Sequence, residues 1–207
     1  MPRRNVLKVD APDSYYHVYA RGNNRLNIFR DKRDYAIFLS LLKRYLSIEP
    51  QQASEGYIYP SLAGKVALLC FCLMPSHFHL LLYQYDEKAM ETLMRGVMTS
   101  YSRYFNKKYK RTGTLFESRY KASLISQQSY LEHITRYIHI NPASWQKYPY
   151  SSLPFYLGKQ KADWVIPQRI LGLFGTKQEY LSFLKDYEDN KRMLDEIKYE
   201  LANTITT

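Results

Sequence analysis

Residues 66–83 read VALLCFCLMPSHFHLLLY, and this stretch decides the fold of the chain. Two apolar runs, one from Val66 to Met74 and one that ends at Tyr83, are separated by Pro75 and Ser76. Apolar runs of this length, bounded by a proline break, are typical of buried strands. The stretch therefore predicts a strand, a turn and a second strand.

The second strand carries two histidines separated by one residue. Side chains alternate between the two faces of a strand, so His77 and His79 point the same way while Phe78 packs behind them. Two imidazoles on a rigid strand are half of a metal site and lack a third ligand. Because paired histidines on a half-buried strand are also common as structural residues, a second motif is needed to indicate function.

The composition is that of a basic globular protein. The 207 residues are 45% hydrophobic and 24% charged, which suits one domain with a core plus an extension. There are 30 Lys and Arg against 19 Asp and Glu, a formal net charge of +11 that suggests a nucleic-acid partner. Many of the 21 Tyr stand beside basic residues, and such pairs suit unstacked bases and a phosphate backbone. The alternative is a protein that is merely basic.

The two cysteines, Cys70 and Cys72, are too few for a disulfide framework. We interpret them as reduced thiols in the core. The basic start of the chain is not followed by an apolar signal segment, and no stretch is long enough to span a membrane. We therefore expect a soluble protein of the cytoplasm.

The other elements follow from periodicity and from the residues that begin or end them. Asp31 is expected to cap a helix to about Ser47, and a second long helix is expected from Asp86 to about Lys108. Ser129 and Glu132 form a capping-box pattern before a short helix over about 130–140, which Pro142 ends. The remaining expected elements are strands at 14–21 and 115–125, a turn at 22–25, a loop at 49–64 and a helical stretch at about 177–200.

The short helix presents two side chains of interest. Tyr137 and Asn141 are four residues apart and share a face. An Asn amide oxygen can bind a divalent ion, and a Tyr hydroxyl can attack phosphorus as a nucleophile. Asn141 would then complete the metal site begun by His77 and His79. Two alternatives stay open, because Tyr137 also lies near the apolar face of this helix and because the ligands could instead be its own histidines, His133 and His139.

Four stretches of the chain together resemble motifs of the REP-associated tyrosine transposases, which belong to the HUH single-tyrosine transposase superfamily. Residues 74–79 (MPSHFH) resemble the motif of histidine, hydrophobic residue and histidine, and residues 137–142 (YIHINP) resemble the helix that carries the tyrosine. Residues 16–25 (YHVYARGNNR) and 113–121 (GTLFESRYK) match the start of the family and the segment before that helix. The resemblance covers about residues 14–145.

This resemblance implies an α+β fold, with a ferredoxin-like antiparallel sheet and helices packed on one face. It implies a transposase domain at residues 1–145 and a partly helical C-terminal extension at 146–207. The implied cofactor is Mg²⁺ or Mn²⁺, and the implied nucleophile is Tyr137. The implied metal ligands are His77, His79 and Asn141.

The implied activity is cleavage and joining of single-stranded DNA at or near hairpins of repetitive extragenic palindromes. The intermediate would be a 5′-phosphotyrosine, and the protein would act as a monomer or a homodimer. Two positions depart from the family pattern. Ser76 stands where Asn is common, which leaves the metal ligands intact, and residues 143–146 (ASWQ) replace a run whose contacts therefore cannot be carried over.

Cations on or beside the strands next to this site are candidates for phosphate contacts, although each could equally be a solvated surface charge. They are Arg21, Arg25, Arg119 and Lys121. Two further functions remain as alternatives. The fold could bind DNA hairpins without cleaving them, or a structural Zn²⁺ could be bound by Cys70, Cys72, His77 and His79.

Overall fold

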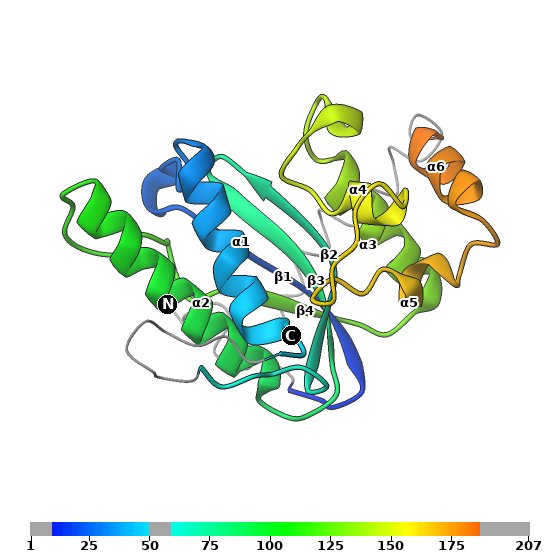
Figure 1. Ribbon diagram of the computed structural model, residues 1–207, viewed down its shortest axis with the longest axis horizontal. Helices are drawn as coiled ribbons and strands as arrows, with labels where there is room; N and C mark the ends of the chain where they lie inside the picture. The colour runs from blue at the N-terminus through cyan, green and yellow to red at the C-terminus, as the bar shows by residue number, and fades with distance from the viewer. Residues whose placement is uncertain (1–9, 50–58, 187–207) are drawn as a thin grey trace, which may run out of the picture.

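The computed structural model describes residues 10–49 and 59–186. Its centre is a four-stranded antiparallel sheet with the strand order β2-β3-β1-β4 (Figure 1). The strands are β1 (Ser14–Arg21), β2 (Val66–Met74), β3 (His77–Gln84) and β4 (Lys121–Ile125). A 3₁₀ turn, η1 (Asn23–Arg25), follows β1.

Two long helices, α1 (Lys32–Leu46) and α2 (Ala89–Lys108), pack together on one face of the sheet (Figure 1). Helix α1 begins at Asp31 in a capping box, in which the Asp31 and Asp34 side chains each accept a backbone N–H of the other residue. The ammonium of Lys108 lies 2.6 Å from both carboxylates, so the end of α2 is fastened to the start of α1.

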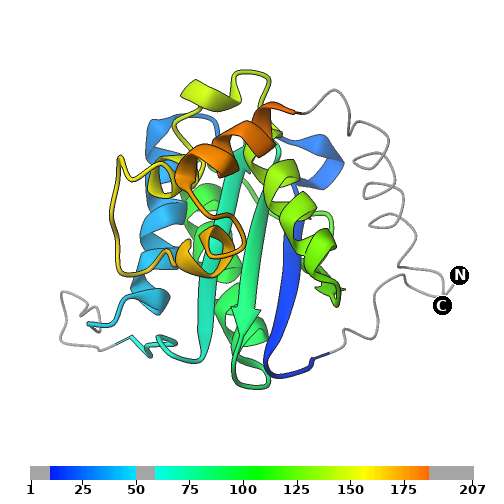
Figure 2. The same cartoon turned by 90° about the vertical axis from the view of Figure 1, so that its right-hand side faces the viewer.

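Helix α3 (Gln128–Ile140) covers the other face of the sheet together with the chain that follows it (Figure 2). The later elements are η2 (Trp145–Lys147), α4 (Leu153–Tyr156), α5 (Gln168–Leu171) and α6 (Lys177–Lys185). Their apolar side chains form a second core with β2 and β3, which includes Leu81, Ile138 and Tyr156. Strand β2 is apolar along its whole length and β3 is apolar from Leu80 to Tyr83, because both faces of these strands are covered.

The chain after α3 also covers the outer edge of the sheet. Strand β2 is one of the two edge strands, and its backbone bonds to residues of the extension: Leu73 N–H to Tyr150, Ser152 N–H to Phe71, and Ile166 N–H to Leu68, each at 2.9 Å. An exposed edge of this kind is a template for unwanted strand pairing, and covering it removes that hazard. The extension is therefore packed onto the sheet along the edge as well as the face.

The predicted α+β class with an antiparallel sheet is confirmed. The order of the first six regular elements is βαββαβ, as in ferredoxin-like folds. The structure adds that helices cover both faces, because α3 and the extension bury the face opposite α1 and α2.

Two local predictions were wrong, and one lies partly outside the described residues. The strand expected at 115–125 is confined to β4, because Leu115 and Phe116 instead pair with the turn after β1. Helix α3 begins at Gln128 without a side-chain cap, so Ser129 and Glu132 lie inside the helix and form no capping box. The C-terminal helix is described from Lys177 to Lys185, and the rest of that prediction falls on residues outside the described range.

Both cysteines are buried and unpaired, as predicted. Within the described residues, no helix combines the length and apolar character needed to cross a membrane.

Candidate functional site

The site lies on the face of the sheet that α3 covers, across strands β1 and β3. In the register of these strands Tyr19 is opposite His79, and Arg21 is opposite His77. Because alternate residues of a strand share a face, His17 and Tyr19 of β1 lie on the same face as the two histidines of β3. The aromatic contacts agree, since the ring of His17 stacks on Tyr19 (5.2 Å) and on His79 (5.1 Å).

His17 and His79 are joined by a hydrogen bond. Nε2 of His17 lies 2.9 Å from Nδ1 of His79, and both rings are buried. Burial lowers the pKa of His17 to about 3 and lowers the pKa of His79 well below its usual value. For His79 the positive charges of His17, His77 and Arg21 act in the same direction. Both imidazoles are therefore neutral near pH 7, which is the state that a metal ligand requires.

Each of these two rings keeps one nitrogen without a partner. Among the described residues, Nε2 of His79 and Nδ1 of His17 are buried polar atoms that make no hydrogen bond. Buried polar groups are usually paired, so an unpaired one calls for an explanation, such as an ion. The free Nε2 of His79 is suited to a metal.

His77 is half-buried and its ring has two partners. Nδ1 lies 3.1 Å from the hydroxyl of Ser76, and the ring also hydrogen-bonds to the side chain of Asn141. Burial lowers the pKa of His77, Arg21 lowers it further, and the hydrogen bond to Asn141 acts against both. Asn141, the C-cap of α3, is thus brought next to His77, although 64 residues separate them in the sequence.

Tyr137 lies one helical turn before Asn141, and its ring edge meets the histidines of the sheet. The centroid of its ring is 5.2 Å from that of His79 and 6.1 Å from that of His17. The four residues that the sequence analysis assigned to metal binding and nucleophilic attack therefore gather in one place, although the three candidate ligands come from β3 and the end of α3.

Two residues of this cluster were missed by the sequence analysis: His17 and Tyr19. Tyr19 stacks at 5.9 Å on His79, and its pKa is raised by burial and then by the charge of Tyr137, while Arg21 opposes the shift. The available signal was the alternation of His17 and Tyr19 on a predicted strand. That signal becomes informative only when the pairing of β1 with β3 is known.

The residues present fit a divalent ion at this cluster. Neutral imidazoles bind divalent metal ions, an amide oxygen suits Mg²⁺ or Mn²⁺, and the ring of His79 has a nitrogen that nothing else among the described residues uses. The other two potential donors, His77 and Asn141, already lie in hydrogen-bonding contact.

The zinc alternative is not supported. Among the described residues, no three His, Cys, Asp or Glu side chains are grouped so that they could hold a metal ion. Cys72 contacts the sulfur of Met74, and Cys70 lies 3.3 Å from Nε2 of His139.

The alternative ligands on α3 are also unsuitable. His139 is fully buried, and its ring bonds to residues of the extension and not to the cluster on β1 and β3: Nδ1 lies 2.6 Å from the Tyr180 hydroxyl and Nε2 lies 2.7 Å from the Ser152 hydroxyl. Among the described residues His133 also has an unpartnered Nδ1, but its ring packs against Phe183 of α6, with 5.6 Å between their centroids, and so lies outside the cluster on β1 and β3.

The four candidate phosphate contacts surround the end of β1. Lys121 lies opposite Tyr19 in the sheet, with its ammonium 5.7 Å from the centre of that ring. Arg21 is exposed and acts electrostatically on both strand histidines. Arg25 and Arg119 are exposed on the two segments that pair beside Arg21, where Asn23 N–H bonds to Leu115 and Glu117 N–H bonds to Arg21.

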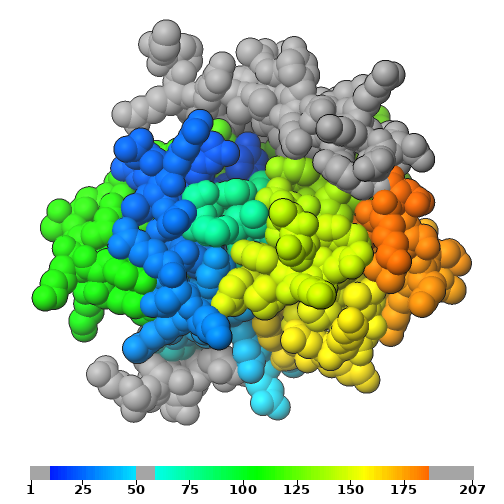
Figure 3. All heavy atoms as spheres, turned by 90° about the horizontal axis from the view of Figure 1, so that it is seen from above, coloured from blue at the N-terminus to red at the C-terminus, as the bar shows by residue number. Residues whose placement is uncertain are grey.

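The end of the molecule that carries these segments is seen in Figure 3. The turn between β2 and β3 lies at its centre, with the chain after β1 on one side and the chain after α3 on the other. Backbone hydrogen bonds join the three parts, from Gly22 to Ser76 and from Leu73 to Tyr150.

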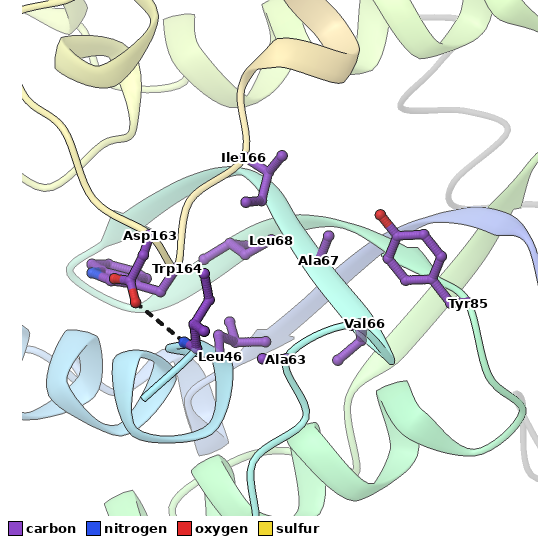
Figure 4. A pocket seen from close by; sticks show the side chains of 11 residues that line it. Leu46, Ala63, Val66, Ala67, Leu68, Tyr85, Asp163, Trp164 and Ile166 are labelled. Carbon is purple, nitrogen blue, oxygen red and sulfur yellow. Dashed lines mark hydrogen bonds between the residues drawn. The ribbon is translucent and has the colours of Figure 1, made fainter. Parts of the chain in front are cut away.

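An apolar pocket of about 210 Å³ lies elsewhere, at the opposite end of β2 (Figure 4). It is lined by residues such as Leu46, Leu68 and Trp164, and Asp163 is the only charged residue of its lining. The Asp163 carboxylate accepts the backbone N–H of Ile48 at 3.2 Å. This pocket offers no group for the chemistry considered above.

The sequence profile of the family described as "Transposase IS200 like" matches residues 11–141. This range contains every residue of the cluster on β1, β3 and α3. No curated protein matches the chain in sequence.

One solved structure has a similar fold: the REP-associated tyrosine transposase bound to a REP hairpin. Its TM-score is 0.54 at 12% identity, and the match covers 78% of this chain and 90% of that chain. At this identity the similarity shows the fold alone.

Two further structures align less well. A transposase-like protein from Deinococcus radiodurans R1 has a TM-score of 0.39 at 16% identity, covering 67% of this chain and 95% of that chain. The tRNA(His) guanylyltransferase from Saccharomyces cerevisiae has a TM-score of 0.40 at 11% identity, covering 86% of this chain and 79% of that chain. Both scores are too low to indicate a shared fold.

Proposed function

The chain belongs to the IS200-like transposase family, and from this premise we propose that it cleaves and rejoins single-stranded DNA through a covalent bond to Tyr137. The proposed substrate is DNA at or near a hairpin, of the kind formed by repetitive extragenic palindromes. The similarity in fold to a transposase bound to a REP hairpin supports this class of substrate. The observation that carries the proposal is the contact of Tyr137 with a pair of buried histidines, one of which has an unused ring nitrogen.

In the proposed step the Tyr137 oxygen attacks phosphorus and the bond from phosphorus to the 3′-oxygen breaks. The phenol loses its proton to solvent and the departing 3′-oxygen gains one, so the products are a 5′-phosphotyrosine and a free 3′-hydroxyl. Rejoining is the reverse, with a 3′-hydroxyl attacking the phosphotyrosine. The energy of the broken bond is retained in the covalent intermediate, so no nucleotide cofactor is required.

The residues proposed to hold the metal are His77, His79 and Asn141. A Mg²⁺ or Mn²⁺ ion bound there supplies positive charge that stabilises the phosphate oxygens as the transition state forms. The hydrogen bond of His77 to Asn141 supports this assignment, because it holds two of the three ligand side chains together. Tyr137 lies on α3 and Asn141 is the C-cap of that helix, so one element holds the proposed nucleophile and one proposed ligand.

We further propose that the DNA backbone follows the cations at the end of β1. Arg21 and Lys121 flank the site, and Arg25 and Arg119 extend the positive charge along the neighbouring segments. The ring of Tyr19 lies between Lys121 and His79, where an unpaired base could stack on it. Because phosphate contacts release counterions, affinity should fall steeply between low and moderate salt.

The test is the formation of the covalent intermediate. The wild-type protein and Tyr137→Phe are incubated with 3′-labelled single-stranded hairpins, with Mn²⁺ or with EDTA, and the products are resolved on a denaturing gel. We expect a protease-sensitive labelled adduct with the wild type and Mn²⁺, and none with EDTA or with Tyr137→Phe.

The matched control is Tyr130→Phe, which removes a hydroxyl from the same helix and should leave the adduct unchanged. An adduct that persists in Tyr137→Phe would refute the assignment of the nucleophile. Hairpin binding without any adduct, on the flanking DNA of the native locus as well as on unrelated hairpins, would replace the proposal by a DNA-binding function of the same fold.

A further inference from the structure

We propose that His17 is a positioning residue, which accepts a hydrogen bond from Nδ1–H of His79 and so leaves Nε2 of His79 free of a proton for the metal. This inference rests on the proposed function for the role of His79 as a ligand. It adds a residue of β1 to a site whose proposed ligands come from β3 and α3.

The number of protons on the two rings restricts how His17 and His79 can pair. A histidine must be a neutral imidazole to bind a metal, and a neutral imidazole has one N–H and one bare nitrogen. The contact between Nε2 of His17 and Nδ1 of His79, at 2.9 Å, needs one donor and one acceptor. Only two arrangements of the protons satisfy it.

In the first arrangement His79 donates from Nδ1, so its Nε2 is bare and can bind a metal. In the second arrangement His17 donates from Nε2, and the proton of His79 must then lie on its own Nε2, where it blocks a metal. A histidine that binds a metal through one ring nitrogen usually donates the other N–H to a neighbouring acceptor, which fixes the tautomer. The nearest acceptor here is His17.

Only the first arrangement lets a metal give a partner to one of the atoms that are unpartnered among the described residues. Nε2 of His79 and Nδ1 of His17 have no partner among the described residues in either arrangement. A metal on Nε2 of His79 gives a partner to one of these two buried atoms, and it can do so only in the first arrangement. Metal binding and the hydrogen bond to His17 therefore support each other.

The ring of His17 is fixed in a position from which it can accept the hydrogen bond of His79. It has no exposed surface and belongs to β1, a central strand paired on both sides. The hydrogen bond holds it nearly coplanar with the ring of His79, the ring of Tyr19 lies 5.2 Å away, and the ring of Tyr137 lies 6.1 Å away at a steep angle. Since the same ring touches the proposed nucleophile and a proposed ligand, its replacement should disturb both unless the new side chain keeps the acceptor.

The first experiment needs no variant and no metal. Long-range ¹H–¹⁵N spectra of the histidine rings in the EDTA-treated protein report which nitrogen of each ring carries the proton. We expect His79 to be protonated on Nδ1 and bare on Nε2. A spectrum in which His79 carries its proton on Nε2 would overturn the inference directly.

The second experiment measures Mn²⁺ affinity without DNA, from the free Mn²⁺ signal in electron paramagnetic resonance. His17→Phe removes the acceptor at similar ring volume and should weaken Mn²⁺ binding about 10- to 100-fold, the range found when such partners are lost. His17→Gln offers an amide oxygen as acceptor and should bind within about threefold of wild type. His133→Gln is the matched control, because it changes a histidine outside the cluster. Unchanged affinity in a folded His17→Phe would overturn the inference.

The two proposals fail in different ways. If no DNA adduct forms but Mn²⁺ binding depends on the acceptor at position 17, the proposed function fails and the role of His17 stands. If an adduct forms and the ring spectra show a proton on Nε2 of His79, the proposed function stands and the role of His17 fails.

Discussion

Two buried histidine clusters lie on the same face of the sheet, and they differ in how their nitrogens are used. His139 of α3 has both ring nitrogens occupied, by the hydroxyls of Tyr180 and Ser152. In the pair formed by His17 and His79, each ring keeps one nitrogen that has no partner among the described residues. Burial lowers the pKa of His17 and of His139 to about 3, so neither cluster is charged near pH 7.

The difference is between a ring whose hydrogen bonds are all made and a pair that keeps two nitrogens unpartnered among the described residues. The partners of His139 come from α6 and from the segment before α4, so this ring fastens the extension to the helix that carries Tyr137. A buried polar atom without a partner costs about 1–3 kcal/mol, and the His17–His79 pair has two of them. A cost of this kind is expected at functional sites, where a ligand later removes it.

The largest effect is expected from His79→Ala, which removes the free nitrogen. Loss of a metal ligand at a phosphate should reduce adduct formation at least about 1,000-fold, or about 4 kcal/mol in the barrier. The free energy of unfolding should change less than in His139→Ala, because the variant also removes an unpartnered atom. Gel assays of adduct formation and urea denaturation measure the two quantities. Strong destabilisation with normal adduct formation would remove the contrast between the clusters.

The next effect is expected from His139→Ala, and it concerns stability. The variant leaves a cavity in the second core and strands the hydroxyls of Tyr180 and Ser152, so the free energy of unfolding should fall by about 3 kcal/mol. Urea denaturation followed by circular dichroism measures this loss. The Mn²⁺ affinity of the folded protein should stay close to that of the wild type. A variant that keeps its stability and loses Mn²⁺ binding would show that His139, too, serves the metal site.

Local sequence signals were sufficient for most of the framework. The proline between two apolar runs predicted the hairpin of β2 and β3, and Asp31 predicted the start of α1. They failed where structure depends on contacts that are distant in sequence. Leu115 and Phe116 have the apolar character of a strand, but the turn after β1 is their partner and they lie outside the sheet.

The proposed ligands and nucleophile could be selected from spacing and resemblance, whereas their supporting residues could not. His17 stands in an aromatic, β-branched strand and looks like any half-buried residue until β1 is paired with β3, 62 residues away. The difference between the two clusters was equally hidden, because His79 and His139 occupy similar apolar surroundings in sequence. Only the positions of Tyr180 and Ser152 show that, within the described residues, His139 has a hydrogen-bond partner at each ring nitrogen, whereas His79 does not.

The smallest effect concerns the hydrogen bond between His139 of α3 and Tyr180 of α6. Tyr180→Phe removes one hydroxyl and leaves Nδ1 of His139 unpartnered, which should cost about 1–2 kcal/mol in the free energy of unfolding. If the two residues act through their 2.6 Å hydrogen bond, the double variant with His139→Ala should lose about 1 kcal/mol less than the sum of the single losses. Additive losses would mean that α6 is held by apolar packing alone. Adduct formation per folded molecule should stay unchanged in Tyr180→Phe, because the unused nitrogens of His17 and His79 are untouched.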